Sequence, residues 1–169
     1  MFDKLKKLFM DKQDQEADDK YILVPESEIN ETLKRDIVKL EEVGETYCKS
    51  LQHKYRSKFE RDGKQNLKVW VCRDIDGDQL PNLSSKQCLE KEYRSQVAIN
   101  FDGFTDEEDA YAYYIQLWYY FSGGSKGVGS LYDSLKYDLE TDIKDRLDEL
   151  LKEIQLIMDR RNIMITKNV

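Results

Sequence analysis

The chain is poor in the residues that interrupt secondary structure and in those that build reactive centres. Its 169 residues include two prolines, eight glycines, three cysteines and one histidine. The scarcity of proline and glycine favours long, uninterrupted elements. The cysteines, Cys48, Cys72 and Cys88, form no C-x-x-C pair, and a zinc site would need nearly all of them together with His53. We therefore expect reduced, partly buried thiols in a cytoplasmic protein that holds no metal and no cofactor.

Long apolar runs and an excess of positive charge are missing as well. No stretch is long and apolar enough to cross a membrane, and the first ten residues lack the apolar centre of a signal peptide. The net charge is −7. Direct binding to nucleic acid needs an excess of lysine and arginine, so this balance disfavours it and favours a basic protein partner. With 40% apolar residues, the chain is expected to fold.

The N-terminal segment differs in composition from the rest of the chain. Its first ten residues, "MFDKLKKLFM", place apolar side chains at helical spacing with lysines opposite them, which predicts an amphipathic helical arm over residues 1–12. An acidic linker over residues 13–20 and a single domain over residues 21–169 follow. Because so short an apolar face binds membranes weakly, we expect the arm to dock on the chain itself or on a partner. Its apolar residues are Phe2, Leu5, Leu8 and Phe9.

Two long helices are predicted by apolar residues that recur every three or four positions. The first series runs from Ile29 to Phe59, with Gly44 as a point at which the helix could break. The second begins at Gly129 or Ser130 and ends at Asn162. Because the two helices match in length, we expect an antiparallel pair, within one chain or across a homodimer.

Strand signals lie before and between these helices. Short β-rich runs predict strands at residues 21–24, 66–74 and 96–101, and a last strand at residues 162–166. A short helix capped by Ser84 or Ser85 is expected between the second and third strands. The fold class that follows is α+β, dominated by helix, with a small mixed sheet flanked by the long helices.

A segment rich in tyrosine, "TDEEDAYAYYIQLWYYF", occupies residues 105–121. Thr105 and Glu108 have the spacing of a capping box, which predicts a helix that is apolar around most of its circumference. Such a helix is typical of a core, but its tyrosine hydroxyls also suit a protein interface or a platform on which bases stack. The residues that we assign to an interface here are Tyr113, Tyr114, Trp118, Tyr119, Tyr120, Asp106, Glu107, Glu108 and Asp109.

The segment "GGSKGVGS" at residues 123–130 is similar in composition to a phosphate-binding loop. In a P-loop, however, the lysine follows the last glycine and a strand precedes the loop. Here Lys126 comes too early and a helix is expected before it. We therefore interpret these residues as a flexible connector between two helices.

The string "VWVCRDIDGDQL" carries Asp74, Asp76 and Asp78 after a predicted strand. Counted from Asp74, its glycine stands two positions too early for an EF-hand loop. The string loosely resembles the first motif of haloacid-dehalogenase-type phosphatases, an apolar strand that leads into D-x-D-G-T. The resemblance covers fewer than ten residues and implies that Asp74 is a nucleophile and Asp76 a general acid. Asp78 stands where that family has threonine, and Arg73 interrupts the apolar run, so we expect an Asp-Gly turn at the end of a strand.

Three functions are compatible with these patterns. The first, which we expect, is a non-enzymatic, cytoplasmic regulatory protein that binds another protein through a helical, tyrosine-rich surface. The second is a small acidic inhibitor of the phage or mobile-element type, which would occupy the basic groove of a nucleic-acid-binding enzyme through its clustered acids. The third is a metal-dependent hydrolase that uses the turn at Asp74 and Asp76, with Asp78 as a further weak metal candidate.

Overall fold

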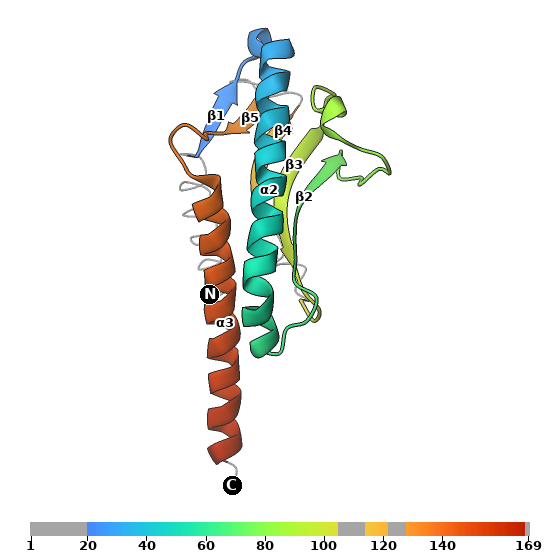
Figure 1. Ribbon diagram of the computed structural model, residues 1–169. Helices are drawn as coiled ribbons and strands as arrows, with labels where there is room; N and C mark the ends of the chain where they lie inside the picture. The colour runs from blue at the N-terminus through green and yellow to red at the C-terminus, as the bar shows by residue number, and fades with distance from the viewer. Residues whose placement is uncertain (1–19, 105–113, 122–127, 168–169) are drawn as a thin grey trace, which may run out of the picture. The chain divides into compact units, whose positions relative to one another are not determined.

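The computed structural model describes residues 20–104, 114–121 and 128–167 (Figure 1). These residues form five strands, two long helices and two short 3₁₀ helices, so the α+β class expected from the sequence is confirmed. The predicted arm and nearly all of the linker lie outside the described residues. In chain order the elements are β1 (Tyr21–Val24), η1 (Glu26–Glu28), α2 (Glu31–Arg61), β2 (Lys68–Ile75), η2 (Ser85–Gln87), β3 (Tyr93–Asn100), β4 (Ile115–Tyr120), β5 (Gly129–Tyr132) and α3 (Leu139–Lys167).

The five strands form one antiparallel sheet in the order β1-β5-β4-β3-β2, so the predicted mixed sheet is wrong. Parallel neighbours need a long crossover connection between them. Here β2 to β5 follow one another both in sequence and in the sheet. Helix α2 joins β1 to β2, which lie at opposite edges of the sheet.

The contacts of the chain divide it into two compact units, and α2, β2, β3 and β4 contribute residues to both. Unit 1 comprises Met1–Glu41, Arg73–Ser95 and Gln116–Asp138. Unit 2 comprises Glu42–Cys72, Gln96–Ile115 and Leu139–Val169.

The core of unit 1 is built around Trp118 of β4. Its indole N–H donates a hydrogen bond of 2.8 Å to the carbonyl of Cys88, and Ile37 and Tyr93 belong to the same buried cluster. In the neighbouring strand, Gly129 leaves room for this indole, because a Cβ atom there would collide with the ring of Trp118. At least one glycine of the glycine-rich segment is therefore required by packing.

In unit 2, the second half of α2 packs against α3. The hydroxyl of Tyr55 donates to Asp148 at 2.7 Å, and Gln155 contacts Asp62 at 3.5 Å. Both pairs are separated by 93 residues, so the two helices run in the same direction, as Figure 1 also shows. The long helices are therefore paired, but the predicted antiparallel arrangement is wrong. Apolar periodicity identifies the buried face of a helix and carries no information about the direction of its neighbour.

The ends of α2 follow ordinary capping rules. The side chain of Asn30 accepts a hydrogen bond from the backbone N–H of Leu33 at 3.0 Å. At the other end, Gly63 has a φ of 80°, and the N–H of Lys64 donates to the carbonyl of Phe59 at 2.8 Å. This arrangement is a Schellman motif, which explains the glycine after the helix. The helix continues through Gly44 without a break.

Three predictions of secondary structure in the second half of the chain are wrong. Residues 115–120 form strand β4, and residues 129–132 form strand β5, which pairs with β4 and begins no helix. The glycine-rich segment therefore follows β4 and ends within β5, so it does not connect two helices. The predicted last strand at residues 162–166 is helical, because α3 continues to Lys167. The isoleucines there have strand propensity, but propensity alone decides little where no neighbouring strand is present to pair with.

Candidate functional site

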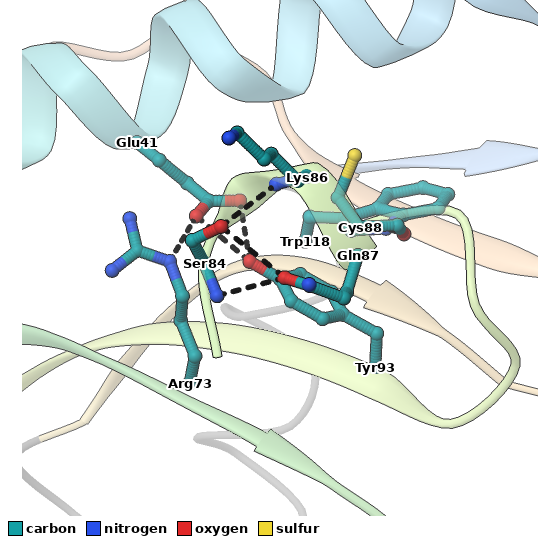
Figure 2. A network of polar contacts seen from close by, with 8 residues as sticks. All are labelled: Glu41, Arg73, Ser84, Lys86, Gln87, Cys88, Tyr93 and Trp118. Carbon is teal, nitrogen blue, oxygen red and sulfur yellow. Dashed lines mark hydrogen bonds and ion pairs between the residues drawn. The ribbon is translucent and has the colours of Figure 1, made fainter. Parts of the chain in front are cut away.

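A buried polar network in unit 1 joins α2 to β2 and β3 (Figure 2). Glu41 of α2 accepts a hydrogen bond of 2.6 Å from the Nε of Arg73. The hydroxyl of Tyr93 lies 2.8 Å and 2.9 Å from the two carboxylate oxygens of Glu41. The side chain of Glu41 is 0% exposed and that of Arg73 is 16% exposed. The carboxylate is thus removed from water and held by a charge-assisted hydrogen bond and a hydroxyl.

The surroundings of Glu41 change its proton affinity. Burial raises the pKa of Glu41 above its ordinary value of 4.5, while the charge of Arg73 and hydrogen bonds from Tyr93 and Arg73 oppose this rise. Burial and the adjacent carboxylate also raise the pKa of Tyr93. A general acid or base must reach the substrate, and Glu41 and Tyr93 are both fully buried. We therefore interpret the network as structural, since it fixes α2 against two strands.

Beside this network, η2 is capped at its C-terminal end by Cys88, which belongs to the buried cluster of unit 1. Ser84 caps η2: its Oγ accepts from the N–H of Lys86 at 3.3 Å, and its own N–H donates to Gln87 at 2.9 Å (Figure 2). The short helix expected here is therefore confirmed as a 3₁₀ helix with a capping box. Burial raises the pKa of the Cys88 thiol to about 11. A nucleophilic cysteine needs a lowered pKa, so Cys88 is a core residue.

The acidic string forms a two-residue hairpin turn at the end of β2. Ile75 and Asp78 exchange backbone hydrogen bonds of 3.0 Å and 2.9 Å, and Asp76 and Gly77 between them have φ values of 53° and 84°. This is the geometry of a type I′ turn, for which Asp-Gly is a preferred pair. The expected Asp-Gly turn is confirmed.

Both carboxylate oxygens of Asp74 have partners at or near this turn. One oxygen accepts from the N–H of Gly77 at 3.2 Å, and the other lies 3.1 Å from the Nε of Arg94. Asp76 and Asp78 are exposed. Among the described residues, no group of three histidine, cysteine or acidic side chains could hold a metal ion. The strand before this turn is an edge of an antiparallel sheet, whereas the phosphatase motif belongs to a parallel α/β pattern, so the resemblance does not extend to the fold.

A second set of contacts ties this region to β4. The hydroxyl of Tyr119 donates to Glu92 at 3.2 Å, and its ring lies 5.7 Å from the guanidinium carbon of Arg94. Burial and then the hydrogen bond to Glu92 raise the pKa of Tyr119. Glu92 has a φ of 70°, its N–H donates to Tyr120 at 2.7 Å, and its carbonyl accepts from Asp76 at 3.2 Å. These contacts hold Glu92, whose backbone has a left-handed conformation, between the turn and β4.

The residues of the predicted tyrosine-rich interface lie in different environments in the structure. Trp118 and Tyr120 are buried in the core of unit 1, so they are not surface residues as the sequence predicted. Tyr114 and Tyr119 are half-buried. Alternate residues of a strand point to opposite faces, whereas the helix that we predicted would have spread these rings around its circumference. Tyr113 and the acids Asp106, Glu107, Glu108 and Asp109 lie outside the described residues, as do Phe2, Leu5, Leu8 and Phe9 of the arm.

The end of α3 in unit 2 carries an exposed apolar surface that the sequence did not single out. By the offset of 93 residues, the last residue of α2, Arg61, corresponds to Ile154, which is the last buried residue of α3. All residues from 155 to 167 are exposed. The large apolar side chains among them are Leu156, Ile157, Met158, Ile163, Met164 and Ile165. We did not predict this surface for two reasons. An antiparallel helix would have covered it, and a strand was expected at residues 162–166.

No helix within the described ranges is long and apolar enough to cross a membrane. Comparisons with protein-family models, with curated proteins and with solved structures found no match to this chain.

Proposed function

We propose that the chain is a non-enzymatic protein that acts by binding another protein through the exposed end of α3, residues 155–167. The observation that carries this proposal is the set of six large apolar side chains there, each at least 41% exposed, of which Ile157, Met158, Met164 and Ile165 share one face. Single exposed apolar residues are common, but a contiguous group is typical of a binding surface. The earlier residues of the same helix bury their apolar face against α2 in the ordinary way.

The buried network at Glu41 supports a non-enzymatic function indirectly. Its carboxylate and its tyrosine are both inaccessible, and Asp74 already accepts two hydrogen bonds within its own turn region. The polar groups of unit 1 are thus used to hold α2, β2 and β3 together. In the part of the chain that the structure describes, the end of α3 has no comparable structural use, because α2 ends before it.

The proposal is tested by affinity capture from a nuclease-treated lysate of the source cell. We expect the wild-type chain to retain a stoichiometric protein partner, and the variant with Ile157, Met158, Met164 and Ile165 changed to serine to lose it. The matched control is Asn162→Ala with Thr166→Ala, on the polar side of the same helix segment, which should retain the partner. Retention of the partner by the four-serine variant would contradict the proposal. If reversal of the charges at residues 106–109 abolished binding instead, the acidic-inhibitor function would replace it.

A further inference from the structure

The exposed end of α3 has an internal symmetry that is centred on Arg161. Met158 and Met164 lie three residues before and after it, and Ile157 and Ile165 lie four residues before and after it. Positions i−4, i−3, i, i+3 and i+4 of a helix share one face. We call these five residues the end face. Its four apolar side chains are 52%, 41%, 66% and 65% exposed for Ile157, Met158, Met164 and Ile165, and Arg161 is also exposed.

We propose that the end face binds the end face of a second copy of this chain, with the two α3 helices antiparallel and a twofold axis beside Arg161. This inference rests on the proposed function and names the partner of the same surface. In a twofold interface, residue i contacts residue j and residue j contacts residue i. An antiparallel register centred on Arg161 places Ile157 opposite Ile165 of the second copy and Met158 opposite its Met164. Every apolar side chain of the face thereby meets one of its own kind.

The place of the end face on α3 also fits a second helix. It begins where α2 ends, since the apolar stripe of α3 continues from Ile154 through Met158 to Ile165 and no helix among the described residues covers it. A helix from a second copy would cover this stripe in the way that α2 covers its earlier part. Antiparallel helices also oppose their macrodipoles, which favours this direction over a parallel pair.

Charge distinguishes a second copy from other occupants. The side chains of Arg160 and Arg161 make the centre of the segment basic, and the predicted N-terminal arm of this chain, with Lys4, Lys6 and Lys7, is basic too. Like charge opposes the arm and a second copy alike, but the spacing of the end face, which is symmetric about Arg161, matches a second copy. A second copy also brings its own Arg161 to the axis, but salt screens that repulsion while leaving the apolar contacts. Self-association should thus strengthen as salt is raised, whereas binding of an acidic protein or an anionic membrane would weaken.

Sedimentation equilibrium of the purified full chain tests the proposal without a lysate. We expect a concentration-dependent dimer whose dissociation constant falls when the salt concentration rises from about 0.05 M to about 0.5 M. Because the contact is only about two and a half helical turns long, the measurement should extend to high protein concentration. Ile157→Ser with Ile165→Ser should weaken the dimer at least tenfold. Leu156→Ser with Ile163→Ser, on another side of the same helix, should leave it unchanged.

Two further variants test the twofold axis and the direction. In an equimolar mixture of wild-type chain and Arg161→Glu, the heterodimer should exceed the one half that random pairing gives, because residue 161 faces its own copy. Under mild oxidation, Ile157→Cys mixed with Ile165→Cys should give a mixed disulfide, and neither variant alone should give a comparable homodimer. Preferential homodimers of Ile157→Cys would show a parallel pair and overturn the proposal.

A wild-type chain that stays monomeric at every salt concentration would also overturn it. If that monomer still captured a partner that the four-serine variant loses, the proposed function would stand while this inference failed. A monomer that captures no partner would remove both. The substituted side chains are exposed, so circular dichroism and thermal melting should confirm that each variant is folded before its association is measured.

Discussion

The hydroxyl of Tyr93 lies within 3 Å of both carboxylate oxygens of Glu41, and neither side chain has any exposed surface. Arg73 completes this contact from β2. A buried ion pair contributes less to stability than its Coulomb attraction suggests, because both charges lose hydration. We expect it instead to contribute specificity, because this register of α2 with β2 and β3 is the one in which the carboxylate reaches both partners.

Replacing Glu41 by alanine should therefore destabilise the chain strongly, by about 3–5 kcal/mol, because it removes the acceptor for two buried donors. The measurement is the free energy of unfolding from urea titrations. The matched control is Glu42→Ala, an exposed neighbour on the same helix, which should change stability by no more than about 0.5 kcal/mol. Replacing Glu41 by leucine together with Arg73 by methionine should cost less than Glu41→Ala alone. Equal losses for Glu41→Ala and Glu42→Ala would show that the pair is not formed.

The same carboxyl group predicts a pH dependence of defined sign. Burial raises the pKa of Glu41 in the folded state above 4.5, so between these two pKa values the folded chain binds more protons than the unfolded chain. The stability contributed by the protonated group is present below pH 4.5 and is lost as the pH rises through the folded-state pKa. Wild type should therefore lose stability relative to Glu41→Gln as the pH rises across this window, as measured by urea titrations at each pH. Glu42→Gln should show no such trend relative to wild type, and a wild type that gained stability relative to Glu41→Gln as the pH rose would contradict the raised pKa.

Packing of Trp118 against Gly129 gives a third prediction. A methyl group at residue 129 would enter the space of the indole, so Gly129→Ala should destabilise the chain by about 1–3 kcal/mol. The cost should be smaller when it is measured in a Trp118→Phe background, because the smaller ring leaves room. A thermodynamic cycle of the two variants measures this coupling. Strict additivity would show that the collision is relieved in another way.

Much of the fold could be predicted from local patterns. The strand at residues 21–24, the long helix α2, strands β2 and β3 and the Asp-Gly turn follow from propensity, spacing and turn chemistry. The buried pair also left a signal that we did not use. Glu41 lies four residues after Ile37 on the buried side of α2, and Arg73 interrupts the apolar run of β2. Two opposite charges that each interrupt an apolar pattern are candidates for a buried pair.

The failures have a common physical origin in tertiary context. The segment from Ile115 to Tyr120 is a short apolar run, and such runs do not distinguish a buried strand from a buried helix by periodicity. Leu131 and Leu135 continued the apolar series of α3 at a spacing of four, but Leu131 belongs to β5 and Leu135 is 96% exposed. The direction of α3 relative to α2 depends on the strands between them, and helical periodicity does not encode it.

The direction of this helix pair can be tested in solution by crosslinking. In the parallel arrangement Asp62 lies beside Gln155, whereas an antiparallel pair centred on the same Tyr55 contact would place Asp62 beside Thr141. We therefore expect a short thiol crosslinker to join the two cysteines of Asp62→Cys with Gln155→Cys. The two cysteines of Asp62→Cys with Thr141→Cys should remain uncrosslinked. The native cysteines should not interfere, because Cys48, Cys72 and Cys88 are buried and burial raises the pKa of the Cys48 thiol to about 12. The control is the wild-type chain, whose thiols should react only after unfolding. A crosslink that formed only between positions 62 and 141 would reverse the assigned direction, and it would also remove the reason why α3 is left uncovered after Ile154.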